Sequence, residues 1–463
     1  MFGIHNNNMK QHYKTSPKNK SALQSAKTFT ALRNFRLDAS LVIFHKIFNM
    51  NQRNLLASLA LILFISACSE PKEKQTDQAD FSAKAKELAQ EFIIVDGHVD
   101  LPYRMEQGGF MVQQKVLNVS VDAADGNFDY PRAKAGGLDA PFMSIYIPSQ
   151  YQYIDGYAKK FADSLITMTK QLANTYPDQF AMAYSPADVE ANFKAGKISL
   201  PMGMENGAPV EDDITLVEEF QKKGIRYITL THGKDNKISD SSYDTTRTHG
   251  GLSEYGKQVV AEMNRVGIMV DISHVSDDTF WQVMELSTAP VIASHSSARK
   301  FTPGFERNMG DDMIKALGEN DGVIMINFGS SFLDGEYRAR RAEYDEHVIN
   351  WLAERELSKN DPEAVAYLEE YTKQNDPWSN VEKVADHIDH VVKLTGGTDN
   401  VGIGSDFDGV GDSLPTGLKD VSMYPNLIEE LLERGYSEED IAKICYKNVF
   451  RVWNKVEEVA ANS

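Results

Sequence analysis

Cysteine is almost absent from this 463-residue chain, which contains only Cys68 and Cys445. One intramolecular disulfide is the most that it could form, and none remains if Cys68 is modified. We expect Cys445 to be a buried helix residue. Basic residues are also scarce, with 48 Lys and Arg against 67 Asp and Glu and a net charge of −19. Such a chain has no basic field to attract phosphates, which argues against a nucleic-acid partner.

Near its N-terminus the chain lacks an apolar run long enough to cross a membrane. Residues 55–65 are apolar, but the run is too short for a stable spanning helix. A basic stretch precedes it and small residues follow, which is the order of a secretory signal peptide. Its ending, Ile65-Ser66-Ala67-Cys68, resembles the lipobox of bacterial lipoproteins, with Ile65 where leucine is usual. The alternative is an ordinary signal peptide with an incidental cysteine.

These features predict the organisation of the N-terminal part. Residues 1–49 are interpreted as an upstream or unstructured segment, since Met50 is a plausible start. Residues 50–67 form the predicted lipoprotein-type signal peptide, and Cys68 is the predicted site of lipidation. A polar tether over 68–82 then leads to a folded domain over 83–463. We therefore expect a protein attached through an N-terminal lipid to the bacterial cell envelope, at the outer membrane or the periplasmic face.

Short runs rich in Ile, Val, Met and Tyr alternate with amphipathic stretches along the rest of the chain. The runs cover residues 92–95, 142–147, 198–204, 226–230, 268–272, 291–293, 323–327 and 401–404. This alternation predicts parallel strands joined by right-handed helical crossovers. Eight units favour a closed α/β barrel of the (β/α)₈ type, with its active site at the C-terminal ends of the strands. A doubly wound open sheet is the alternative.

Residues suited to metal binding stand where the predicted strands end. Five of them are His98 and Asp100 after the first strand, Glu205 after the third, His274 after the fifth and His295 after the sixth. Five side chains are too many for one hydrolytic ion with an open position, but they fit two ions that share a carboxylate. Glu205 is the natural bridge between them. We expect two Zn²⁺, with Mn²⁺ or Co²⁺ also accepted, and a shared hydroxide as nucleophile.

With these motifs the chain resembles the membrane (renal) dipeptidase family, the zinc peptidases of family M19. The matching stretches include Asp96-Gly97-His98-Val99-Asp100, Gly203-Met204-Glu205-Asn206-Gly207, Leu230-Thr231-His232, Val270-Asp271-Ile272-Ser273-His274, Ala293-Ser294-His295-Ser296-Ser297, Arg307-Asn308 and Gly404-Ser405-Asp406-Phe407-Asp408-Gly409. They cover most of the predicted domain. The resemblance implies a metal-dependent hydrolase barrel that cleaves small dipeptide substrates, including those with C-terminal D-residues, at a binuclear zinc centre.

The resemblance also implies roles for three further residues. His232 would contact the tetrahedral intermediate, Arg307 would hold the C-terminal carboxylate of the dipeptide, and Asp406 would act as the acid/base near the bridging water. Arg299 is a rival for the carboxylate clamp.

Four other residues receive structural interpretations. Asp408 is expected to cap a turn, and Asp271 to orient a ligand histidine. His387 and His390 have metal-pair spacing but lie in a predicted helix, so we expect packing or surface roles.

The connection over residues 332–380 is longer than a strand–helix link needs, and it is charged and helical in pattern. We expect a helical insertion after strand seven that serves as a lid or as an oligomer contact, for example in a homodimer.

Two other functions fit part of the pattern. Another binuclear amidohydrolase is the alternative enzyme, although such enzymes commonly bridge their metals with a carboxylated lysine after strand four, where this chain has Leu230-Thr231-His232. A lipid-anchored solute-binding protein is the alternative outside the enzymes, but it would not need Asp406 beside open metal positions.

Overall fold

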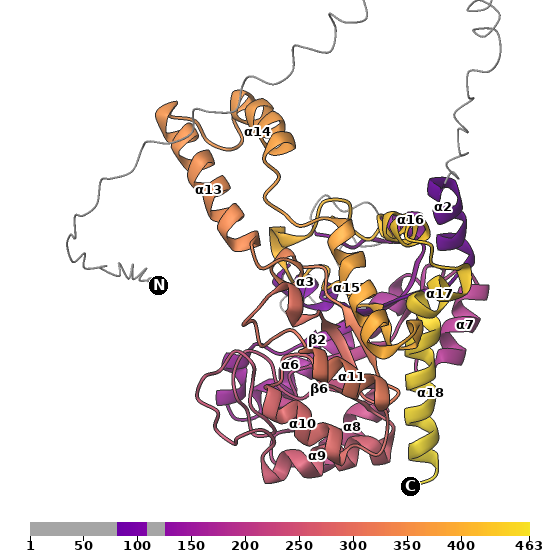
Figure 1. Cartoon of the computed structure of the whole chain (residues 1–463). Coiled ribbons are helices and arrows are strands. Elements are labelled where there is room, and N and C mark those ends of the chain that lie inside the picture. The colour runs from indigo at the N-terminus through magenta and orange to yellow at the C-terminus, as the bar shows by residue number, and fades with distance from the viewer. Residues whose placement is uncertain (1–80, 109–125) are drawn as a thin grey trace, which may run out of the picture. The chain divides into compact units, whose positions relative to one another are not determined.

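The computed structural model describes residues 81–108 and 126–463. Eight parallel strands form one sheet in the order β1-β2-β5-β6-β7-β8-β9-β10 (Figure 1). They are β1 (Ile94–Val99), β2 (Leu138–Tyr146), β5 (Met202–Glu205), β6 (Ile225–Thr229), β7 (Met269–Asp271), β8 (Ile292–Ser296), β9 (Val323–Ile326) and β10 (Val401–Ile403). The prediction of a parallel eight-stranded α/β barrel is confirmed.

The sheet closes on itself between its first and last strands. Val99 forms a parallel bridge with Phe407, just beyond β10. The amide of Asp100 donates to the carbonyl of Phe407 at 2.9 Å, and the amide of Asp406 donates to the carbonyl of His98 at 3.1 Å. Residues far apart in sequence, near 100 and 406, therefore lie side by side at the C-terminal end of the strands.

Helices surround the strands. They are α2 (Phe81–Glu91), α3 (Leu101–Gln107), α5 (Tyr130–Gly136), α6 (Tyr157–Thr175), α7 (Pro186–Lys194), α8 (Thr215–Lys223), α9 (Glu254–Val266), α10 (Asp277–Leu286), α11 (Asp311–Glu319), α12 (Ser330–Leu333), α13 (Tyr337–Glu354), α14 (Pro362–Gln374), α15 (Val381–Thr395), α16 (Tyr424–Glu433), α17 (Glu438–Ala442) and α18 (Asn448–Ala461). Local sequence sets their ends. In α9, Ser253 accepts a hydrogen bond from the amide of Gly256, and Gly267 ends the helix with a left-handed backbone.

The prediction of a single third strand over 198–204 is wrong, because two strands lie there. The structure divides it at Pro201 into β4 (Ile198–Leu200) and β5. A proline has no amide hydrogen to continue a strand ladder. β4 instead pairs with β3 (Phe180–Met182) in a separate two-stranded parallel sheet, which the sequence pattern did not reveal.

The hydrophobic core has two main parts. The larger cluster lies between the strands and the surrounding helices. The smaller joins side chains of six barrel strands to α18, for example Phe142, Tyr227 and Trp453. Since six strands contribute to it, this cluster fills the inside of the barrel. The rings of Phe142 and Trp453 lie 5.2 Å apart.

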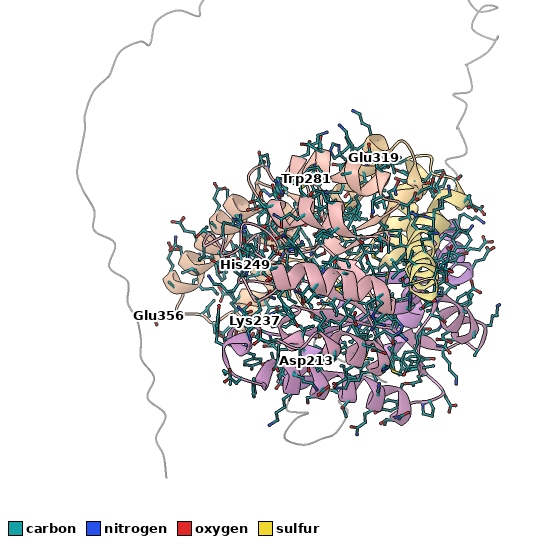
Figure 2. All side chains as sticks on the ribbon, turned by 90° about the horizontal axis from the view of Figure 1, so that it is seen from below. Asp213, Lys237, His249, Trp281, Glu319 and Glu356 are labelled. Carbon is teal, nitrogen blue, oxygen red and sulfur yellow. The ribbon has the colours of Figure 1, made fainter. Side chains whose placement is uncertain are left out.

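A helical insertion follows β9, the seventh strand of the barrel, as predicted. Its two long helices, α13 and α14, lie beside each other and away from the barrel strands (Figure 1). They share a small core of Val348, Leu352 and Ala364. Glu356, in the turn between them, lies at the left edge of the folded part in Figure 2. The pair therefore packs as a small unit of its own on the barrel.

The predicted signal peptide, the lipidation site at Cys68 and most of the tether lie outside the described residues. Cys445 is buried, as predicted, in a π-helical turn over Lys443–Lys447. In the two described stretches of the chain, no helix is both long and apolar enough to cross a membrane.

Candidate active site

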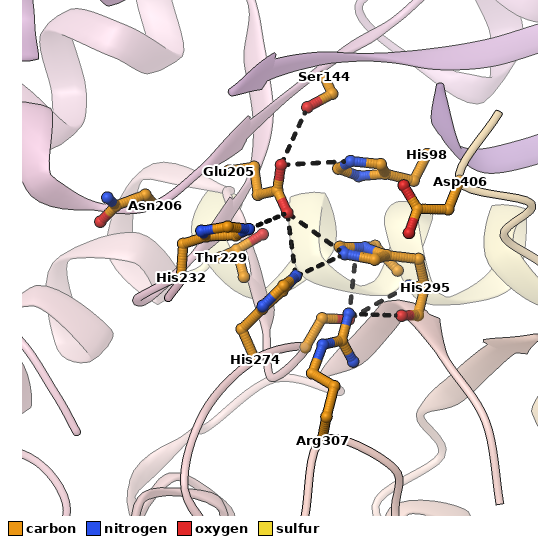
Figure 3. A network of polar contacts seen from close by, with 12 residues as sticks. His98, Ser144, Glu205, Asn206, Thr229, His232, His274, His295, Arg307 and Asp406 are labelled. Carbon is orange, nitrogen blue, oxygen red and sulfur yellow. Dashed lines mark hydrogen bonds and ion pairs between the residues drawn. The ribbon is translucent and has the colours of Figure 1, made fainter. Parts of the chain in front are cut away.

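The side chains that follow the barrel strands converge on Glu205 (Figure 3). Its Oε2 atom lies 3.4 Å from Nε2 of His98. Its Oε1 atom lies 3.0 Å from Nε2 of His274 and 3.4 Å from Nε2 of His295. Each carboxylate oxygen thus faces a different set of imidazoles, which is the arrangement expected of a carboxylate that bridges two cations.

The fifth predicted ligand, Asp100, and the predicted acid/base Asp406 complete the cluster. Nε2 of His98 lies 3.4 Å from Oδ2 of Asp100. One ligand atom from each of His98, Asp100 and Asp406 lies within 4.8 Å of the other two. All five predicted metal ligands are thereby brought together.

His232 lies as close to the bridge as the predicted ligands do. Its Nε2 is 3.5 Å from Oε1 of Glu205, so it also belongs to a three-residue group with His274. It differs from His295 in exposure, because the His232 side chain is 23% exposed and that of His295 is 1% exposed. The His232 ring packs edge-on against Tyr146 at 4.8 Å. His232 therefore faces the open side of the site.

Several buried atoms in the cluster fit a bound cation. Nε2 of His98 and Oδ1 of Asp100 are buried and have no hydrogen-bond partner. Nε2 of His274 and Nε2 of His295 face each other at 2.9 Å. Unpartnered buried polar atoms are costly, and a divalent ion would satisfy these nitrogen and oxygen atoms together.

Tyr227 holds the ring of His98. The Tyr227 hydroxyl lies 2.9 Å from Nδ1 of His98 and donates to the carbonyl of Gly97 at 3.0 Å. Because its single hydrogen is used on Gly97, the hydroxyl accepts from Nδ1–H of His98. In the neutral ring the lone pair of His98 is then on Nε2 and points at Glu205 and Asp100. Gly203 makes this possible, since a Cβ there would lie 1.9 Å from the Tyr227 ring.

A chain of two hydrogen bonds, from Asp271 through Ser294, fixes the ring of His295. Oγ of Ser294 lies 2.8 Å from Nδ1 of His295 and donates to Oδ2 of Asp271 at 2.6 Å. Nδ1 of His295 therefore carries the hydrogen, and its Nε2 lone pair faces the cluster. Asp271 also accepts from the amides of Ser273 and Ser294. The expectation that Asp271 orients a ligand histidine matches this geometry, although it acts through the Ser294 hydroxyl.

Charge in the cluster is set by the carboxylates. Burial alone would raise the pKa of Glu205, but the imidazoles of His98 and His232 hold it well below its usual range. Burial lowers the pKa of His98, whereas Tyr227, Glu205 and Asp100 raise it well above its usual range, so without a cation this ring holds a proton that a bound metal ion would displace. Burial keeps the pKa values of His274 and His295 well below normal, so both imidazoles are neutral, as metal ligands must be.

Asp406 is a buried carboxyl group that can hold a proton. Burial, with the nearby charges of Asp100 and Glu205, raises the pKa of Asp406 to about 8. The Nδ2 group of Asn327 donates to its Oδ2 at 2.8 Å. A carboxyl whose pKa lies near neutrality is suited to proton transfer.

Of the two candidate arginines, only Arg307 lies at the site. Arg299 is occupied by a two-bond ion pair with Asp277, at 2.7 and 2.5 Å. Arg307 is 3% exposed and donates to Oγ of Ser296 at 2.6 Å and to the carbonyl of His295 at 2.7 Å. Its buried Nε–H has no partner. A guanidinium has five N–H donors, so Arg307 keeps hydrogen-bonding capacity for a ligand.

The backbone at the strand ends is unusual. His274 and Asp406 have φ of 68° and 63°, in the left-handed region that disfavours side chains. Gly409 packs against both carboxylates there, since a Cβ on it would lie 2.1 Å from Oδ1 of Asp406 and 2.2 Å from Oδ2 of Asp100. Such conformations cost energy and persist where the surrounding structure holds functional groups in place.

Comparison with known proteins identifies the family. Residues 82–463 match the model of the membrane dipeptidase family, peptidase family M19. The chain belongs to this family. The dipeptidase is 31% identical over 391 residues to an uncharacterized dipeptidase of Schizosaccharomyces pombe, which covers 81% of this chain and 84% of the yeast protein.

Two solved structures have the same fold. The probable dipeptidase PvdM of Pseudomonas aeruginosa is 26% identical, with a TM-score of 0.66 over 82% of this chain and 99% of that one. A metallopeptidase of Rhodobacter sphaeroides, solved with a phosphinate mimic of the dipeptide L-Ala-D-Ala, is 24% identical, with a TM-score of 0.63 over 79% of this chain and 99% of that one. The protein is a metallodipeptidase, and the binding-protein alternative is set aside.

Several residues of the site were missed from the sequence. Tyr227 and Ser294 act only through neighbouring histidines, and no motif marks that role. Asn327 was within reach, because it stands at the end of the seventh predicted strand, where the strand-end argument applies.

Asp408 and His387 have structural roles, as expected, although Asp408 caps an amide of a distant segment rather than one in its own turn. The Asp408 carboxylate accepts from the amide of Asn127 at 2.6 Å and pairs with Arg104 at 2.9 Å. The buried His387 ring hydrogen-bonds the amide of Ala298 and the carbonyl of Leu333.

Proposed function

We propose that this dipeptidase cleaves the peptide bond of free dipeptides at a centre of two zinc ions that share one carboxylate. The residues proposed to hold the ions are His98, Asp100, Glu205, His274 and His295. The observation that carries the proposal is the division of Glu205, whose Oε2 faces His98 while its Oε1 faces His274 and His295. When bound, the two cations polarise the scissile carbonyl and lower the pKa of water. These ligand types also accept Mn²⁺ or Co²⁺.

His232 is proposed to stabilise the transition state rather than to hold metal. It is the half-buried imidazole of the cluster and faces the open side, whereas His295 is buried and fixed by Ser294. Burial lowers the pKa of His232, so the ring is neutral near pH 7 and has one N–H to donate. A donor fixed in advance toward the developing oxyanion favours the transition state over the substrate.

Asp406 is proposed to move the proton. Its carboxyl lies within 4.8 Å of the ligand atoms of His98 and Asp100, where the attacking water must lie. Asn327 fixes one of its oxygens, which leaves the other for the water and then for the leaving amine.

Arg307 is proposed to bind the C-terminal carboxylate of the substrate. It is buried beside the cluster and keeps unpaired N–H donors. A guanidinium pairs with a carboxylate through two parallel hydrogen bonds, which would select substrates with a free C-terminus. Arg307→Ala is expected to lower kcat/KM for Ala-Ala at least tenfold more than for Ala-Ala amide. Equal losses for the two substrates would move the clamp elsewhere.

Tolerance of a D-residue at the C-terminal position is part of the proposal. It is supported by the Rhodobacter sphaeroides metallopeptidase of the same fold, which was solved with a mimic of L-Ala-D-Ala. In an envelope lipoprotein this activity would serve peptidoglycan turnover.

We propose anchoring through lipid on Cys68; a Cys68→Ser variant would then be released from membranes, and persistent membrane attachment would contradict the anchor.

The decisive experiment combines a metal count with a substrate panel. Elemental analysis of the purified protein should give two zinc ions per chain. L-Ala-L-Ala and L-Ala-D-Ala should both be hydrolysed, a chelator should abolish the activity, and added Zn²⁺ should restore it. Chelator-resistant hydrolysis would overturn the metal mechanism, and failure to cleave L-Ala-D-Ala would end the proposal on D-residues.

A further inference from the structure

Arg338, in the first turn of α13, is a cation without a counter-charge. It is exposed, and it forms no ion pair with any residue that the structure describes. Its guanidinium carbon instead lies 5.6 Å from the ring centroid of Phe305. The neighbouring arginines are engaged, since Arg340 pairs with Asp334 at 2.8 Å and Arg341 with Asp345 at 3.0 Å. Arg338 is thus the arginine of this turn that remains free for a ligand.

A chain of aromatic contacts connects Arg338 to the catalytic cluster. The Phe305 ring lies 5.5 Å from the ring of Phe332, and the Arg307 guanidinium lies 5.3 Å from that same ring. Phe305 also lies 6.1 Å from Tyr243. One phenylalanine pair therefore separates the buried guanidinium of Arg307 from the exposed guanidinium of Arg338.

Tyr243 contacts both the catalytic cluster and Phe305. Its ring lies 5.9 Å from His274. Burial raises the pKa of its hydroxyl, while Arg307 and Arg338 oppose that rise. Both guanidinium groups therefore act on the same phenol at the rim of the site.

The space beside Arg338 can hold a side chain. A hollow of about 220 Å³ is lined by Thr302, Phe305, Ser331 and Arg338, among others. The one carboxylate in its wall, Asp334, is neutralised by Arg340. The hollow is therefore cationic in character. The apolar ring of Phe305 on one side lowers the local dielectric and strengthens attraction for an anion.

We propose that Arg338 selects dipeptides whose C-terminal residue has a carboxylate side chain, Asp or Glu. The proposal rests on the proposed function, in which Arg307 binds the main-chain carboxylate. Arg307 would then bind the main-chain carboxylate, which every dipeptide has. Arg338 would bind the side-chain carboxylate, which only an acidic C-terminal residue has. Because Arg338 belongs to the helical insertion, the insertion supplies a specificity residue to the barrel.

The experiment compares kcat/KM for Ala-Glu, Ala-Gln and Ala-Ala, each with the C-terminal residue in L and in D form. Metal-loaded wild type is expected to favour Ala-Glu over Ala-Gln by five- to tenfold, the range of a partly desolvated charge-assisted pair. Arg338→Gln should bring that ratio to about one, and Arg338→Lys should keep part of it. Raising the salt concentration should reduce the wild-type ratio.

Arg341→Gln is the matched control, because Arg341 lies on the same helix but is paired with Asp345. It should leave the Ala-Glu to Ala-Gln ratio as in wild type. A wild-type ratio of one or less would overturn the proposal, and so would an Arg338→Gln variant that loses the same factor on all three dipeptides. Cleavage of Ala-Ala without an acidic preference would refute only this inference, whereas no cleavage of any dipeptide would refute the proposed function.

Discussion

Replacing Tyr227 by Phe tests how this dipeptidase orients His98, the first of its proposed metal ligands. The Tyr227 hydroxyl accepts from Nδ1–H of His98 and donates to the carbonyl of Gly97, and the ring is fully buried. The change removes one oxygen atom, so the packing of the ring against Gly203 is kept. Its effect should therefore be confined to the hydrogen bonds of His98 and Gly97.

The size of the effect follows from those two bonds. A buried donor or acceptor left unpaired costs about 1–3 kcal/mol. Loss of a partner that orients a metal-binding histidine typically lowers metal affinity about 10–100-fold, which corresponds to roughly 1.4–2.8 kcal/mol. We therefore expect the cation beside His98 to bind 10–100-fold more weakly, while the cation beside His274 and His295 keeps its affinity.

Competition with a fluorescent chelator measures this directly. Wild type should release both ions over a narrow range of chelator, whereas Tyr227→Phe should release one ion early and the second as in wild type. Tyr255→Phe is the control, since the Tyr255 hydroxyl contacts the carbonyl of Val210 at 3.5 Å and hydrogen-bonds none of the residues proposed to bind metal. Unchanged release of both ions, or an equal loss of affinity for both, would refute the role of Tyr227 in orienting His98.

Three further predictions follow. Glu205→Ala should lose both cations, so two tightly held zinc ions in that variant, by elemental analysis, would refute the bridge. Asp406→Asn should keep its metal while kcat falls about 10²–10⁴-fold, and unchanged turnover in steady-state assays would remove its role in proton transfer. Burial raises the pKa of Asp139 to about 7, so the folded state binds this proton more tightly than the unfolded state and stability falls as pH rises from about 4 to 7. Asp139→Asn should remove a loss of roughly 3 kcal/mol in the free energy of unfolding between pH 5 and 8. Denaturant titrations in which wild type and variant show the same pH dependence would contradict this.

The barrel and the clustering of the proposed metal ligands could be predicted because both leave local signals. A buried run of Val, Ile and Met marks a strand, and the polar residue that follows it marks the C-terminal end. His98, Glu205 and His295 each stand at such a place. The barrel topology then brings these residues together, because parallel strands in one barrel have all their C-terminal ends on one side.

The residues that support the ligands left no such signal. Tyr227 appears in the sequence as an ordinary strand residue, and only the three-dimensional pairing places its hydroxyl beside His98. The left-handed backbone of His274 is likewise invisible, because the residue type disfavours it and only the surrounding contacts enforce it. The division at Pro201 was readable, but the apolar run on both sides concealed it.

The bridge between Val99 and Phe407 also bears on when the protein becomes active during its synthesis. As the ribosome makes the chain, the first ligand emerges at His98, but the barrel cannot close around it until the segment beyond β10 has been made. In an incomplete chain the histidines of the cluster are therefore separated, and the site is not yet assembled. Acquisition of metal must wait until almost the whole polypeptide has been made, and it would report that the last strand has docked.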